Sequence, residues 1–155
     1  MKILSGGQTG VDRAALDTAI EKGISYGGWC PRGGWAEDLP ESPGLLALYP
    51  HLHETPLRDP AQRTEWNVRD ADRLMILTGG AGITVSRGTE AARGFAIELG
   101  KPSLVLDLDT NVAFPSARAF LGEGGSDVSI CIAGPRESEA PGIYVKARQF
   151  LRRLL

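Results

Sequence analysis

The sequence predicts an α/β domain of three layers, in which helices cover both faces of a mainly parallel sheet. Apolar runs of strand length alternate with segments of helical periodicity along the chain, as in parallel strands joined by crossover helices. The run at residues 74–77 is uniformly apolar and lies between two charged residues and two glycines. Such a run is typical of a strand that is buried on both faces of a parallel sheet.

The first half of the chain begins with a short apolar strand and a helix that carries valine and alanine toward the core and ends at Gly23. A weaker strand follows, and then a long loop rich in proline and glycine at residues 30–44. The strands expected here are residues 2–4, residues 24–29 and a short strand within residues 48–60, and the helices are residues 10–22 and 61–71.

The second half repeats the alternation. The helix after the apolar strand is closed by Gly100, with Pro102 just beyond it. The C-terminal helix carries its apolar residues at helical spacing, on Ile143, Ala147, Phe150, Leu151 and Leu154. The strands expected here are residues 74–77, 104–108 and 127–133, and the helices are residues 89–99, 114–121 and 143–154.

Length and charge limit the function classes. At 155 residues the chain is expected to form a single domain over residues 1–155. A net charge of −2 gives no electrostatic reason to expect nucleic acid or an acidic membrane as partner. No apolar run approaches the roughly 20 residues of a membrane span, and no signal peptide is recognised, so we expect a cytoplasmic protein. Cys30 and Cys131 lack metal-binding spacing and are expected to be reduced thiols, and no protein-metal site is predicted.

Ligands of such sheets bind at the carboxyl ends of the strands, which directs attention to the turn after the first strand. Gly6 and Gly7 can expose their amides, Gln8 and Thr9 can add donors, and Gly10 begins the helix, whose positive end favours an anion. The spacing matches neither the dinucleotide-binding nor the Walker pattern. A tight strand-to-helix turn with Thr9 as helix cap explains the same residues equally well.

Charged residues next to this turn suggest further contacts. Asp12, in the first turn of the helix, already suits the helix dipole. Arg13 does not, which favours a contact with a ligand or partner. In the following loop, Arg32 lies between Trp29 and Trp35, which could form a platform for a flat heterocycle or could simply pack the loop down.

Two later turns resemble the first in position. Gly88 and Thr89 begin a helix after the apolar strand, and Arg136 and Ser138 precede the last helix. Three such turns at one sheet edge, with Arg136 and Arg32 as cations, predict a phosphate-bearing small-molecule ligand.

Two polar patterns are expected to lie in solvent. Arg63, Asn67 and Asp70 share one face of a helix, which is usually a solvated face. His51 and His53 alternate without a third metal ligand, and we expect a solvated pair.

Several motifs resemble, in order and nearly in form, those of the family named putative molybdenum cofactor carriers, and they span residues 3–143. These motifs are "SGGQTGVDRAALD", "GWCPRG", "AED", "RTEWNVRDAD", "RGTE" and "AGPRES" followed by "PGI". That family is similar to the circularly permuted branch of the SLOG superfamily, which contains the Lonely Guy phosphoribohydrolases. The resemblance implies a Rossmann-like domain, a homo-oligomer (dimer or tetramer) and a site for a nucleotide or a pterin phosphate such as molybdopterin. The site residues that it implies by position are Gly6, Gly7, Gln8, Thr9, Gly10, Arg13, Gly88, Thr89, Arg136 and Ser138.

One departure concerns catalysis. The phosphoribohydrolases have a glutamate three residues after the threonine of their glycine-rich motif, and here that position is Ala92. Glu90 points about 200° away around the helix and cannot replace it. We therefore favour a non-catalytic binding protein or carrier for the molybdenum cofactor. The alternatives are an enzyme acting on a nucleotide derivative, with Asp12, Glu37 or Glu90 as acid or base, and a nucleotide-sensing module.

Overall fold

A single parallel sheet organises the chain in the computed structural model, which describes residues 1–125 and 127–155. Within these residues the strand order is β3-β2-β1-β6-β4-β5, and all of the neighbouring strands run parallel. The strands are β1 (Lys2–Leu4), β2 (Ser25–Cys30), β3 (Leu52–Glu54), β4 (Arg73–Thr78), β5 (Ser103–Asp107) and β6 (Ser129–Ala133).

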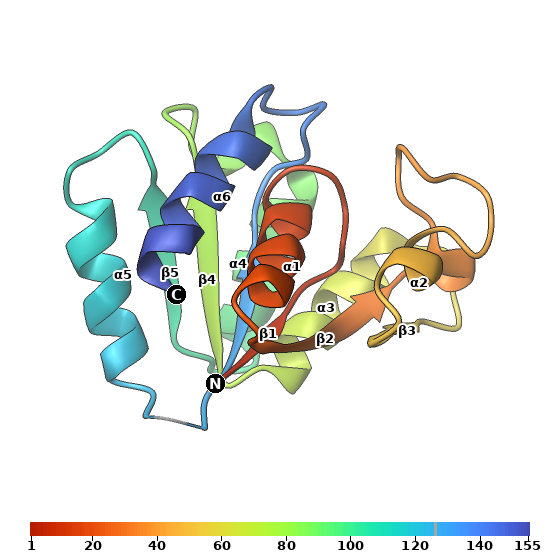
Figure 1. Cartoon of the computed structure of the whole chain (residues 1–155), viewed down its shortest axis with the longest axis horizontal. Helices are drawn as coiled ribbons and strands as arrows, with labels where there is room; N and C mark the ends of the chain where they lie inside the picture. Colours follow the sequence, from red (N-terminus) through yellow and green to blue (C-terminus); the bar gives the residue numbers. More distant parts are fainter. Residues whose placement is uncertain (126) are drawn as a thin grey trace.

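Helices cover both faces of this sheet (Figure 1). One face packs against α1 (Val11–Glu21), α5 (Ala113–Gly122) and α6 (Ile143–Leu154). The other face packs against α3 (Pro60–Asp70) and α4 (Arg87–Glu98). A short helix, α2 (Leu45–Leu48), and two 3-10 turns, η1 (Arg32–Gly34) and η2 (Ile83–Val85), lie in the connections. The predicted three-layer α/β fold is therefore confirmed.

Strand β4 shows why the layers form. Successive side chains of a strand point to opposite faces, so Met75 and Leu77 join the core under α1, α5 and α6, while Leu74 and Ile76 join the core under α3 and α4. All four are fully buried. The uniformly apolar run that predicted this strand is thus explained by a helical layer on each side.

The structure differs from the sequence-based expectation mainly on helix α3. The polar face expected in solvent is buried at Arg63 and Asn67, which are 9% and 2% exposed. Asn67 accepts a hydrogen bond from the backbone N–H of Trp29 and donates one to the Trp29 carbonyl, both at 2.8 Å. Of the three residues, Asp70 alone is exposed as predicted. The prediction was wrong for the other two because helical spacing shows which residues share a face but not what covers it.

Other differences are small. Helix α2 was not predicted, because four residues are too few to show a period. Strand β6 begins two residues later than expected, at Ser129, and α3 begins at Pro60, where the Asp59 carboxylate caps the helix by accepting from the Ala61 N–H at 2.9 Å. None of the helices in residues 1–125 and 127–155 combines the length and the apolar character needed to cross a membrane.

Candidate functional site

A cavity of about 380 Å³ lies beyond the carboxyl ends of β1, β6 and β4. We call it the arginine cavity. Its walls come from the start of α1, the first turns of α3 and α4, and the connection between β6 and α6, and its polar lining includes Asp12, Arg63, Thr64, Thr89, Arg136 and Glu139. This is the edge of the sheet at which open α/β domains bind ligands.

A buried ion pair forms the floor of the arginine cavity. Arg63 Nη1 donates to Asp12 Oδ2 at 2.8 Å, and the two side chains are 11% and 5% exposed. Burial raises the pKa of the Asp12 carboxyl, and the Arg63 guanidinium opposes that rise. The pair lies against the first glycine turn, where a methyl group added at Gly6 would come within 1.9 Å of Arg63 Nη1. Gly6 is therefore required for the close approach of the chain's own arginine.

Two buried polar atoms at this cavity have no hydrogen-bond partner within the described part of the chain, and they are Arg63 Nε and Thr89 Oγ1. Each belongs to a residue that lines the arginine cavity. The neighbouring Thr89 N–H is already satisfied by Ser86 Oγ at 3.3 Å, so the hydroxyl and not the amide is left over. An unpaired buried polar group costs about 1–3 kcal/mol.

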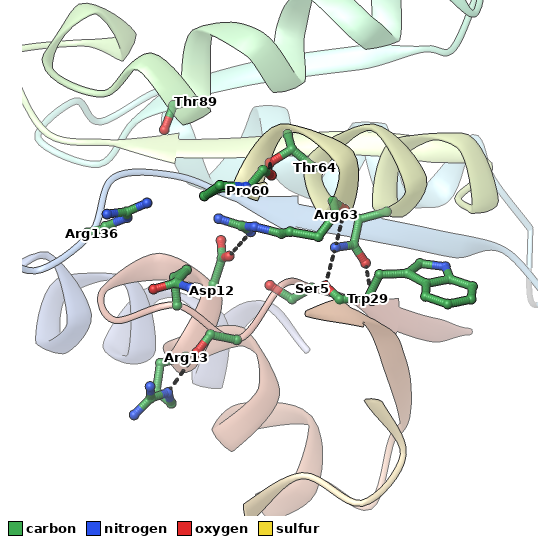
Figure 2. Close-up of polar contacts among 12 residues, drawn as sticks. Ser5, Asp12, Arg13, Trp29, Pro60, Arg63, Thr64, Thr89 and Arg136 are labelled. Atoms are coloured by element: carbon green, nitrogen blue, oxygen red, sulfur yellow. Dashed lines mark hydrogen bonds and ion pairs between the residues drawn. The ribbon is translucent and has the colours of Figure 1, made fainter. Parts of the chain in front are cut away.

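Arg136 borders the same space from the opposite side. Figure 2 shows its guanidinium across the cavity from Arg63, with Asp12 between them and the Thr89 hydroxyl pointing toward the gap. The Arg136 guanidinium lies over the Trp35 ring, 5.8 Å from its centroid, and within 4.0 Å of Glu37 Oε2. The backbone N–H of Arg136 donates to the Glu139 carboxylate at 2.9 Å. Its side chain is 29% exposed and can turn toward a ligand.

Glu37 links three connections behind Arg136. It accepts hydrogen bonds from the hydroxyls of Thr9 and Ser138, and its own N–H donates to Gln8 Oε1 at 3.3 Å. Partial burial alone would raise the pKa of Glu37, but these hydroxyl donors and the charge of Arg136 outweigh it and lower that pKa. The carboxylate thus holds the turns after β1, β2 and β6 together.

The predicted site residues divide between several places. Five of them line the arginine cavity, namely Gln8, Asp12, Gly88, Thr89 and Arg136. Thr9, Gly10 and Arg13 line a separate depression beside α6.

The remaining predicted residues lie outside both spaces. Gly7 faces the side chains of Leu45 and Leu52. Arg32 borders a shallow surface depression with Leu57, and Ser138 is exposed and bonded to Glu37.

Arg13 and the tryptophans have structural partners. Arg13 donates to the Gly7 carbonyl and forms two hydrogen bonds with Asp38, and it points away from the arginine cavity (Figure 2). Trp29 packs edge-on against Trp66 at 4.7 Å and does not line the cavity. Trp29 therefore forms no part of the lining of the arginine cavity.

Sequence reasoning missed Arg63, Thr64, Ser86 and Glu139. Arg63 belongs to the "RTEWNVRDAD" motif that carried the family resemblance, and this motif was the available signal. Its helical spacing alone gave no reason to place the side chain under the cavity.

The described residues contain no group of three or more His, Cys, Asp or Glu side chains that could hold a metal ion. His51 and His53 are exposed, as predicted; His51 stacks on Tyr26, and the His53 ring lies tilted against Trp29. Cys30 and Cys131 are free and buried, and burial raises the pKa of both thiols, to about 11 for Cys30.

Fold and site together define a Rossmann-like domain with a cationic cavity at the carboxyl edge of its sheet. Residues 3–155 match the model of the Circularly permutated YpsA SLOG family, and the chain belongs to this family. It is also similar to a crystal structure from Syntrophus aciditrophicus SB described as a "putative molybdenum carrier protein". The identity is 37% and the TM-score 0.83, over 99% of this chain and 94% of the other. No functionally curated protein matches the sequence.

Proposed function

We propose that this protein binds a phosphorylated small molecule without transforming it, and that the arginine cavity holds the phosphate. The observation that carries the proposal is the pair of buried, unpaired donors, Arg63 Nε and Thr89 Oγ1, on residues that line one cavity. Arg87 and Arg136 also line the cavity, and guanidinium groups match phosphate oxygens in geometry and charge. A volume of about 380 Å³ suits a small ligand.

The ligand that we favour is the molybdenum cofactor, a pterin phosphate, with a nucleotide as the alternative. The name of the related crystal structure supports the first choice. The donors of the cavity fit the phosphate of either ligand, with Arg63, Thr89 and Arg136 as the residues that would hold it. The cofactor would bring its own sulfur ligands for molybdenum, so no protein-metal site is needed. We place this function in the cytoplasm, which two reduced, buried thiols favour.

The proposal is tested on protein purified without denaturation. We expect native mass spectrometry, with metal analysis of the same sample, to find a retained phosphorylated pterin or nucleotide. Arg136→Met should retain at least tenfold less of it, because one of the three guanidiniums that line the cavity is removed. Arg32→Met is the matched control, because Arg32 lies outside the cavity. Equal retention by both variants, or weak binding of phosphate and nucleotides alike to the wild type, would contradict the proposal.

Asp12 supports the second candidate, an enzyme that acts on a nucleotide derivative. It is a buried carboxylate with a raised pKa that lines the cavity, whereas Glu90 is exposed and Glu37 lies outside the cavity lining. Such a group can act as an acid or base. Release of free base from adenosine 5′-monophosphate by the wild type, and its loss in Asp12→Asn, would favour the enzyme over the binding protein.

A further inference from the structure

A second cavity, of about 410 Å³, adjoins the arginine cavity. We call it the glycine groove. It lies between the connection from β4 to α4 and the start of α6, and its lining includes Gly79, Gly80, Gly82, Val85, Asp109 and Lys146. Glu139 lines both spaces, so the two cavities meet at this residue. The Glu139 carboxylate accepts a hydrogen bond from the backbone N–H of Arg136, and this bond holds the carboxylate where the two cavities meet.

Three glycines along these cavities are not required by the fold. A Cβ atom added to Gly79 or Gly80 would come no closer than 3.5 Å to any neighbour, and one added to Gly88 no closer than 3.9 Å. None of the three has a positive φ, unlike Gly82 at 72°. Glycine instead of alanine in a helix such as α4 costs about 1 kcal/mol. Glycine at these positions leaves the backbone bare toward the cavities and open to close approach by a molecule bound there.

These glycines connect the two cavities. Gly79 and Gly80, in the connection between β4 and α4, line the groove, and Gly88, in the first turn of α4, lines the arginine cavity. The unpaired Thr89 hydroxyl, 2% exposed as a residue, is next in the chain after Gly88. One ligand lying along this connection would account for the bare backbone and for the unpaired hydroxyl together.

The charges of the groove indicate which part of a ligand it takes. Its cation, Lys146, is already paired with Asp109, which also accepts from the Gly80 N–H at 3.0 Å. With Glu139 the groove carries two carboxylates and one ammonium, which disfavours a second phosphate. Carboxylates and backbone carbonyls accept hydrogen bonds from ring N–H and amino groups, and bare glycine backbone offers a flat surface.

We propose that the ligand of the arginine cavity extends past Glu139 into the glycine groove, which takes its flat, nitrogen-rich ring. This inference rests on the proposed function, because the phosphate in the arginine cavity fixes one end of the ligand. A purine and a pterin both fit this description. The groove, and not Trp29 or Trp35, then supplies recognition of the ring.

The test compares two probes, inorganic phosphate and guanosine 5′-monophosphate, whose base shares an amino-oxo-pyrimidine ring with pterins. We expect the wild type to bind the nucleotide at least tenfold more tightly than phosphate by isothermal titration calorimetry. Gly80→Leu fills the groove and should lower nucleotide affinity at least tenfold while changing phosphate affinity less than twofold. Gly94→Leu is the matched control, because Gly94 has open space around it and lines neither cavity.

A second variant, Val85→Trp, fills the groove from another wall and should give the same result if Gly80→Leu fails to fold. Unchanged nucleotide affinity in a folded groove variant would overturn the inference, as would a wild type that binds the nucleotide no better than phosphate. In both of these cases phosphate still binds, so the proposed function stands. A wild type that binds neither probe contradicts both proposals.

Discussion

Asp12 and Arg63 show that a residue can serve the fold and the site at once. Their ion pair is buried, whereas the Arg69–Asp70 pair on the surface is 44% and 36% exposed and stabilises little. Removal of one member of a buried pair leaves a charge without compensation and typically costs about 3–5 kcal/mol. The chain's own carboxylate orients the guanidinium through Nη1, and Arg63 Nε has no partner within the described residues.

Thr89 allows stability and binding to be separated at one residue. Thr89→Val keeps the shape of the side chain and removes a buried hydroxyl that has no partner in the described chain. We expect the free energy of unfolding, measured with urea, to stay the same or rise by about 1 kcal/mol. The affinity for inorganic phosphate should fall about tenfold, because a hydrogen bond to the ligand is lost.

Thr18 provides the comparison for this variant. Its hydroxyl is equally buried but donates to the Ala14 carbonyl at 2.7 Å. Thr18→Val should leave phosphate affinity unchanged and lower the free energy of unfolding by about 1 kcal/mol. A loss of stability in Thr89→Val as large as that in Thr18→Val would mean that the Thr89 hydroxyl has a partner in the free protein.

Helix α3 stabilises the sheet edge as an element. Strand β1 ends at Leu4, opposite Gly27, so β2 continues past its neighbour. Asn67 takes the place of a strand there by pairing with the backbone N–H and carbonyl of Trp29. Gly28 permits the contact, because a Cβ at this position would lie 2.5 Å from Asn67 Oδ1.

This arrangement predicts a large effect of removing one amide. Asn67→Ala leaves two backbone groups of Trp29 unpaired, and we expect the free energy of unfolding to fall by about 2–4 kcal/mol in urea denaturation. Asn67→Asp keeps the acceptor and loses the donor, and its loss should be smaller unless the added charge dominates. A loss below about 0.5 kcal/mol in Asn67→Ala would show that water replaces the amide at this edge.

The elements themselves were largely predictable from the sequence. Uniform apolar runs and helix-ending glycines identified β4, α1 and α4 within a few residues of their observed bounds. The rotation of a helix about its axis was harder to predict from the sequence. Asp12 and Arg13 differ by about 100° on α1, so only one of them can face the cavity, and the sequence did not show which.

At the scale of the whole molecule, the arginine cavity is assembled from chain segments far apart in sequence, from Gln8 near the beginning to Glu139 near the end. Parallel topology predicts that the turns after β1, β4 and β6 meet at one edge, and for this reason Thr89 and Arg136 could be placed together from sequence. Arg63 lines the cavity from the first turn of α3, before β4, and no pattern of turns after strands predicts this. The distances within the arginine cavity and the identity of its unpaired atoms could be obtained only from the structure.

Glu37 makes this assembly sensitive to pH, because its carboxylate joins three of the converging turns. Its pKa is lowered in the folded protein, so it contributes stability that is present above the ordinary pKa of a glutamate and is lost as the pH falls through the lowered value. Glu37→Gln should be about 1 kcal/mol less stable than the wild type at pH 7 by urea denaturation. The difference should shrink as the pH falls below the ordinary pKa of a glutamate and through the lowered value, and a constant difference would contradict the assignment.

The two buried thiols have a practical consequence for optical measurement. Cys30 and Cys131 are inaccessible, and their raised pKa values keep them protonated at neutral pH, so alkylating dyes should react with neither in the folded protein. A cysteine introduced at the rim of the glycine groove would then be the selectively labelled position. An environment-sensitive fluorophore there would turn the unmodified fold into a reagentless sensor for whatever molecule occupies the edge of the sheet.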